Sequence, residues 1–81
     1  MNTTVYTKHR CPKCDMTKRA MKGREFYTVN VEEDPDAYRF ITEELGIRMM
    51  PVVVVRDDAN QIIDHWHDLR PDKISRWKDA A

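Results

Sequence analysis

The chain has 81 residues, which suits a single domain, since a second hydrophobic core would need at least about fifty more. Fourteen Lys and Arg residues balance fourteen Asp and Glu residues, and this neutral total disfavours nucleic acid as the main ligand. With 41% hydrophobic and 35% charged residues the composition is that of a folded globule, and no apolar run approaches the roughly 20 residues of a membrane span.

The first half of the chain predicts a strand, a helix and a second strand. Residues 3–7 form a short β-prone run, and a helical pattern follows over residues 12–21. Gly23 stands where this helix is expected to end, because glycine adopts the left-handed conformation without steric cost. Residues 26–31 are rich in aromatic and β-branched side chains, which favours a second strand.

The second half predicts a helix, a β-hairpin and a last helix. Residues 35–45 have a proline near the first helical position and an apolar stripe, and Gly46 closes the helix. The four valines of residues 52–55 are typical of a strand that is covered on both faces. A polar turn at residues 57–60 leads to an antiparallel strand that contains Ile62 and Ile63. The last helix begins near residues 70–72, with Ile74 and Trp77 on its buried side.

The order of elements is therefore β-α-β-α-β-β-α. A helix links the first two strands, so we expect them to be parallel with a right-handed crossover. The final hairpin adds an antiparallel edge. This order predicts an α/β protein with the thioredoxin fold, in which three helices flank a four-stranded mixed sheet, and we expect residues 1–81 to form this single domain.

The two cysteines stand together in the run Cys11-Pro12-Lys13-Cys14. A disulfide across so short a loop restrains the unfolded chain little, so a purely structural bridge is a weak interpretation. The first residues have neither the basic start nor the apolar stretch of a signal peptide, which predicts a cytoplasmic location. In that reducing compartment a Cys-x-x-Cys pair is more often redox-active or metal-binding.

The position of Cys11 favours redox chemistry. It lies between a strand and a helix start, so its sulfur should face the unpaired N–H groups of that helix. Basic side chains at Lys8, Arg10 and Lys13 add positive charge that favours a thiolate. Cys14, one turn further on, should be the more buried thiol. We therefore predict that Cys11 attacks a disulfide of the partner and that Cys14 resolves the mixed disulfide.

A non-catalytic zinc module is the alternative from a different class. It would combine Cys11 and Cys14 with His65 and His67 in a tetrahedral site. We expect these two histidines, on an extended segment, to point to opposite faces, which disfavours one shared ion. His9, near Cys11, is expected to be an exposed loop histidine rather than a catalytic partner.

Three blocks in the right order resemble a known family. They are Val5-Tyr6-Thr7-Lys8 before the cysteine motif, Gly46-Ile47-Arg48-Met49-Met50-Pro51-Val52-Val53, and Trp66 with Leu69-Arg70-Pro71-Asp72. Together they resemble the glutaredoxins and especially the NrdH-type redoxins, over nearly the whole chain. The resemblance implies a small dithiol oxidoreductase with no cofactor other than its own disulfide. Members of this family take electrons from thioredoxin reductase and pass them to a class I ribonucleotide reductase.

The resemblance also assigns residues to the active site. Cys11 and Cys14 become the redox pair, Tyr6 is expected at the rim of the active site, and Pro51 is expected to be a cis-proline facing the cysteines. The backbone of Met50 would then pair with the extended chain of a partner beside Cys11.

The segment after the last strand departs from the family pattern. His67-Asp68 stands where the family usually has Ser-Gly, so Asp68 must replace whatever that glycine does. Glutathione-dependent glutaredoxins carry a Gly-Gly pair here, although Lys8 matches their active-site lysine. We therefore expect a monomeric redoxin that is reduced by thioredoxin reductase, and a glutathione-dependent glutaredoxin is the alternative. We expect Trp66 to be partly exposed and to form the docking rim together with Arg70.

Overall fold

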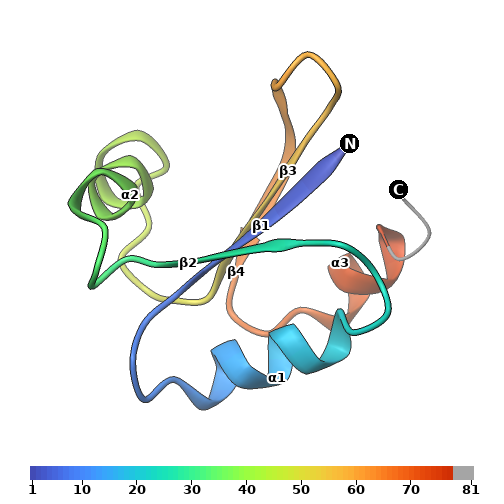
Figure 1. Cartoon of the computed structure of the whole chain (residues 1–81), viewed down its shortest axis with the longest axis horizontal. Coiled ribbons are helices and arrows are strands. Elements are labelled where there is room, and N and C mark those ends of the chain that lie inside the picture. Colours follow the sequence, from blue (N-terminus) through green and yellow to red (C-terminus); the bar gives the residue numbers. More distant parts are fainter. Residues whose placement is uncertain (78–81) are drawn as a thin grey trace.

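One four-stranded sheet organises the computed structural model of this chain, which describes residues 1–77 (Figure 1). The elements are β1 (Asn2–Thr7), α1 (Pro12–Ala20), β2 (Tyr27–Asn30), α2 (Pro35–Arg39) continued by the π-helical segment η1 (Phe40–Glu44), β3 (Val52–Arg56), β4 (Ile62–His67) and α3 (Pro71–Arg76). This is the predicted order of elements. The expected domain runs to residue 81, and its last four positions lie outside the described residues.

The strands are arranged in the order β2-β1-β3-β4. β1 and β2 are parallel, as expected for strands joined by a helical crossover. β3 is antiparallel to both β1 and β4, so the sheet is mixed as predicted. The register places Tyr6 opposite Val52, and Val52 opposite His67, at the end of the sheet from which the chain enters α1.

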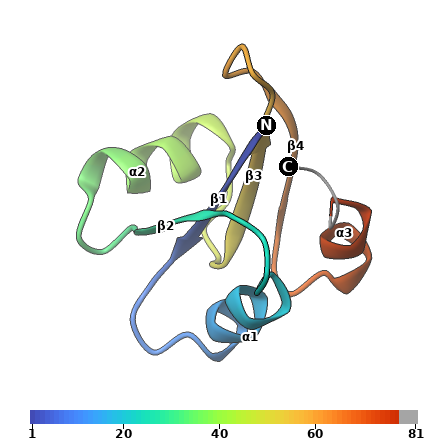
Figure 2. The same ribbon diagram turned by 45° about the vertical axis from the view of Figure 1, so that its right-hand side comes forward.

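Helices cover both faces of the sheet. Figures 1 and 2 show α2 on one side of the strands and α1 and α3 on the other. Val52 and Val54 belong to one apolar cluster with both cysteines, whereas Val53 and Val55 belong to a second cluster that includes Ile74 of α3. All four valines are fully buried, as the unbroken apolar run predicted. Among residues 1–77, none of the helices has the length and apolar character needed to cross a membrane.

The second helix differs from the prediction in its last turn. The α-helical part ends at Arg39, and the chain continues as η1, where the N–H of Leu45 donates to the carbonyl of Phe40 at 3.2 Å. Ile41 is nevertheless fully buried, so the apolar stripe points inward as expected. Gly46 follows with φ +69°, the left-handed conformation that ends the helix.

Two expectations about β4 are wrong. Trp66 was expected to be partly exposed, but it is only 4% exposed because it pairs with Val53 and packs in the cluster of Ile74. His65 and His67 flank it and are exposed, so both histidines lie on the other face of the strand. Residues two apart on a strand share a face, which is why the expected opposite orientation of the histidines fails.

Candidate active site

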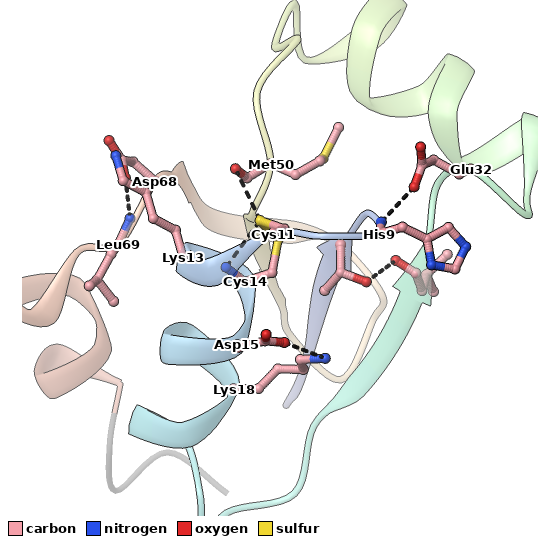
Figure 3. The surroundings of a disulfide bond; sticks show 12 residues. His9, Cys11, Lys13, Cys14, Asp15, Lys18, Glu32, Met50, Asp68 and Leu69 are labelled. Carbon is pink, nitrogen blue, oxygen red and sulfur yellow. Dashed lines mark hydrogen bonds and ion pairs between the residues drawn. A yellow bond between two sulfur atoms is a disulfide. The ribbon is translucent and has the colours of Figure 1, made fainter.

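The two cysteines form a disulfide at the N-terminus of α1 (Figure 3). Cys11 is the N-cap residue, Pro12 is the first helical residue, and the N–H of Cys14 lies 3.1 Å from the Cys11 sulfur. Cys11 is 7% exposed and Cys14 only 1%, so Cys14 is the more buried sulfur, as predicted. Negative charge on Cys11 after reduction would therefore face helix N–H groups, which lower the pKa of such thiols.

The segment before β3 lies against the disulfide. The peptide bond between Met50 and Pro51 is cis, as expected, and the Met50 carbonyl oxygen is 3.8 Å from the Cys11 sulfur (Figure 3). The backbone of Met50 makes no backbone hydrogen bond with any residue of the described part of the chain. Its N–H and carbonyl are thus free to pair with an extended chain that approaches the disulfide.

Asp68 connects three parts of the site. It adopts φ +72°, so the residue that replaces the family's glycine takes the left-handed conformation itself. Its N–H donates to the carbonyl of Pro51 at 2.9 Å. Its carboxylate accepts from the N–H of Leu69 at 2.7 Å and pairs with the ammonium of Lys13 at 3.0 Å. These partners, Lys13 first, lower the pKa of Asp68 below its ordinary value.

The predicted basic residues have different surroundings. Lys8 and Arg10 are exposed, and neither forms an ion pair within residues 1–77. Lys13 is neutralised by Asp68. Arg70, which was expected at the docking rim, binds Asp72 through two hydrogen bonds of 3.0 and 2.8 Å, which lowers the pKa of Asp72 to about 2. Among these four basic residues, the two without a carboxylate partner within residues 1–77 are therefore Lys8 and Arg10, which stand just before Cys11 in the chain.

Two aromatic residues assigned to the site are buried. Tyr6 belongs to the same apolar cluster as both cysteines, and its ring centroid is 5.9 Å from that of Phe40. Tyr6 is only 7% exposed and lies in the core, so its expected position at the rim of the active site is wrong. Trp66 packs in the cluster on the other face of the sheet, so its assignment to the docking rim is wrong.

A polar cluster beside the site was missed from the sequence. The N–H of His9 donates to Glu32 at 2.5 Å, and its ring Nε2 lies 3.2 Å from Glu33 and 3.4 Å from the amide of Asn30. These contacts tie the loop before Cys11 to the end of β2 and the residues just after it, and Figure 3 shows the contact between His9 and Glu32. His9 is exposed, as expected, but the sequence carries no signal of its partners, which lie more than twenty positions away.

The zinc interpretation finds no complete set of ligands among the described residues. Within residues 1–77, no three side chains of His, Cys, Asp or Glu lie close enough together to hold a metal ion. The geometry therefore favours dithiol chemistry at Cys11 and Cys14.

Known proteins with similar sequences agree with this interpretation. The profile of the glutaredoxin family matches residues 3–59. The glutaredoxin-like protein NrdH of Salmonella typhimurium is 41% identical over 78 residues, which cover 94% of this chain and 88% of that protein. NrdH of Escherichia coli K12 is 37% identical over the same shares of the two chains.

Solved structures extend the likeness to three dimensions. The NrdH-redoxin of Escherichia coli matches with a TM-score of 0.83 and 36% identity, and the match covers all of both chains. A glutaredoxin of Archaeoglobus fulgidus matches with a TM-score of 0.72 over 93% of this chain and 83% of that one, and at 22% identity it supports the fold alone. The thioredoxin fold and the resemblance to NrdH-type redoxins are thereby confirmed.

Proposed function

This chain belongs to the glutaredoxin family as an NrdH-type thiol–disulfide oxidoreductase, and we propose that it carries electrons from thioredoxin reductase to a class I ribonucleotide reductase. The observation that carries the proposal is the full-length match to the Escherichia coli NrdH-redoxin, a protein described as having a thioredoxin-like activity profile. We place this carrier in the cytoplasm as a monomer, with its own cysteine pair as the only redox group.

The proposed reaction uses the cysteines in sequence. In the reduced protein the Cys11 thiolate attacks one sulfur of the partner's disulfide, and the partner's other sulfur leaves as a thiolate. The Cys14 thiolate then attacks the Cys11 sulfur of the mixed disulfide and releases the partner as a dithiol. Two electrons have moved to the partner, and Cys11 and Cys14 are left as a disulfide. Thioredoxin reductase would return two electrons from NADPH to this disulfide.

The loop after β4 supports thioredoxin reductase over glutathione as the electron source. In glutathione-dependent glutaredoxins a Gly-Gly pair at this place grips the tripeptide backbone, and here it is replaced by His67-Asp68. The N–H of Asp68 donates to the carbonyl of Pro51, and its carboxylate pairs with Lys13 and accepts from the N–H of Leu69. The groups that could hold one end of glutathione are therefore engaged inside the protein.

The test compares two coupled assays at equal redoxin concentration. One contains NADPH and thioredoxin reductase, and the other contains NADPH, glutathione reductase and glutathione. We expect fast oxidation of NADPH in the first and slow oxidation in the second. Faster turnover with the glutathione system would identify a glutathione-dependent glutaredoxin, for which the exposed Lys8 is the available carboxylate partner.

The acceptor is tested with the reduced redoxin as sole electron donor to a class I ribonucleotide reductase. We expect multiple turnovers of the reductase when thioredoxin reductase and NADPH recharge the redoxin. The acceptor assignment would be contradicted if the product formed did not exceed the amount that ribonucleotide reductase makes from its own initially reduced thiols, without electrons from the redoxin.

A further inference from the structure

We propose that Asp68 is a positioning residue that sets the reactivity of Cys11 by holding the ammonium group of Lys13. The inference rests on the proposed attack by Cys11, and it concerns a residue at which this chain departs from its family. Lys13 lies inside the cysteine motif, whereas Asp68 lies 55 positions later in the loop after β4. Their side chains meet at 3.0 Å across the active site.

The geometry holds the carboxylate firmly in place. The backbone N–H of Asp68 is bound to Pro51 at 2.9 Å, next to the cis bond that faces the disulfide. Its Oδ1 atom also accepts from the N–H of Leu69 at 2.7 Å, which fixes the direction of the side chain. Figure 3 shows Lys13 reaching from the first turn of α1 to this carboxylate. The Lys13 ammonium is thus engaged by Asp68 instead of being free to approach the Cys11 sulfur.

The sign of the effect follows from the charges. A cation beside a thiol favours the thiolate, and an anion disfavours it. The Lys13–Asp68 pair is nearly neutral as a whole, so Lys13 adds little net charge beside Cys11, whose sulfur keeps the Cys14 N–H at 3.1 Å as a hydrogen-bond donor. Removal of Asp68 alone would release a cation, and removal of Lys13 alone would leave an anion.

Other charged groups lie on the segments around the disulfide, and a substitution of Asp68 or Lys13 leaves them unchanged. The charged and titratable side chains on the segments around it are Lys8, His9 and Arg10 before Cys11, Asp15 on α1, Glu32 and Glu33 after β2, Arg48 before Met50, and His67 and Arg70 near Asp68. Three carboxylates already have other partners: Glu33 pairs with His9, Asp15 with Lys18, and Asp72 with Arg70. These carboxylates therefore do not compete with Asp68 for Lys13.

The experiment measures the rate of Cys11 alkylation by iodoacetamide against pH in the reduced full-length protein, with the modified cysteine identified by mass spectrometry. We expect Asp68→Asn to lower the midpoint by roughly half a pH unit, which triples the thiolate fraction well below the midpoint. Because a more acidic thiol is a weaker nucleophile, the rate there should rise only about twofold. Lys13→Gln should raise the midpoint, and the double variant should return close to wild type.

Matched variants separate this effect from a structural one. Asparagine tolerates the left-handed conformation and can still accept from Leu69, so Asp68→Asn removes the charge with little change in the loop. Asp36→Asn makes the same change in net charge at an exposed pair with Arg39 on α2 and should leave the midpoint unchanged. The shift caused by Asp68→Asn should also shrink in about 1 M salt.

The proposal is overturned if Asp68→Asn leaves the alkylation midpoint unchanged or if Asp36→Asn shifts it equally. If Asp68→Asn does not fold, Lys13→Gln alone decides, because it keeps the Asp68 backbone, and an unchanged midpoint would refute the proposal. Alkylation needs no reductase or acceptor. A failure here is therefore distinguishable from a failure of the proposed electron donor in the coupled assays.

Discussion

The backbone N–H of Cys14 lies 3.1 Å from the sulfur of Cys11, so one cysteine residue supplies a hydrogen-bond donor to the other. This contact makes the two sulfurs unequal. Cys11 faces the start of the helix and the Met50 carbonyl, whereas Cys14 lies on the inner side of α1 and is almost fully buried. A partner's disulfide can therefore approach Cys11 more readily than Cys14.

The asymmetry predicts different outcomes for the two serine variants. Cys11→Ser should abolish disulfide reduction, since the attacking thiolate is lost. Cys14→Ser should still attack but should accumulate a mixed disulfide with the partner, because no second thiol resolves it. Activity is measured as reduction of a protein disulfide, and the adduct is measured by non-reducing electrophoresis. Full dithiol activity in both variants would contradict the mechanism.

The burial of Trp66 predicts a role in stability. Trp66→Ala should lower the free energy of unfolding by about 3–5 kcal/mol, because it leaves a large cavity between β3 and α3. Trp66→Phe keeps most of the apolar volume, and the indole N–H that it removes has no partner within residues 1–77. It should cost roughly 1.5 kcal/mol or less. Urea titration measures both values, and a loss below about 1 kcal/mol for Trp66→Ala would argue against a core position.

The left-handed conformation of Gly46 predicts a conformational cost for side chains at this position. An added Cβ atom would meet nothing within 4 Å, so Gly46→Ala introduces no clash. Its φ of +69° should still make Gly46→Ala less stable by about 1–2 kcal/mol. Gly46→Asn is the matched control and should cost less, since asparagine tolerates this region better. Equal stability of the alanine variant and the wild type would contradict the predicted backbone conformation.

The order of the elements and most of their limits could be predicted because they depend on local sequence, and the exception is the change to the π-helical η1 after Arg39. Proline at helix starts, glycine after helix ends and the valine run each act within a few residues. The pairing of Lys13 with Asp68 could not, because it joins side chains from distant elements that only the folded chain brings together. The face of the sheet that Trp66 occupies follows from its pairing with Val53. Strict alternation would have placed His65 and His67 together from the sequence alone.

The shared face of His65 and His67 calls for a direct test of the zinc alternative. We expect substoichiometric zinc in protein purified under reducing conditions, because residues 1–77 provide no cluster of three suitable ligands. The measurement is metal analysis by mass spectrometry, with a His65→Ala and His67→Ala double variant as control. One zinc ion per chain that is lost in the double variant would favour the zinc module over the redoxin.

Asp64 anchors the last helix to β4 and predicts a dependence of stability on pH. Its carboxylate accepts from the Trp77 indole N–H at 2.8 Å and from the Lys73 ammonium at 3.1 Å. Burial acts to raise the pKa of Asp64, but the hydrogen bonds from Trp77 and Lys73 outweigh it and leave the pKa below its ordinary value of 3.8. A lowered folded-state pKa means that the ionised carboxylate stabilises the fold above 3.8, and that this contribution disappears as the pH falls through the folded-state pKa.

Asp64→Asn should therefore lower the free energy of unfolding by about 1–2 kcal/mol at pH 7, because the hydrogen bonds from Trp77, Lys73 and the His65 N–H lose their charged acceptor. The difference between variant and wild type should shrink as the pH falls below 3.8 and through the lowered folded-state pKa of Asp64. Urea titrations at pH 7 and at acidic pH measure both values. Asp36→Asn, at an exposed pair on α2, should change stability by less than about 0.5 kcal/mol at pH 7. A loss for Asp64→Asn that is the same at both pH values would show that the charge of Asp64 contributes nothing to the anchoring of α3.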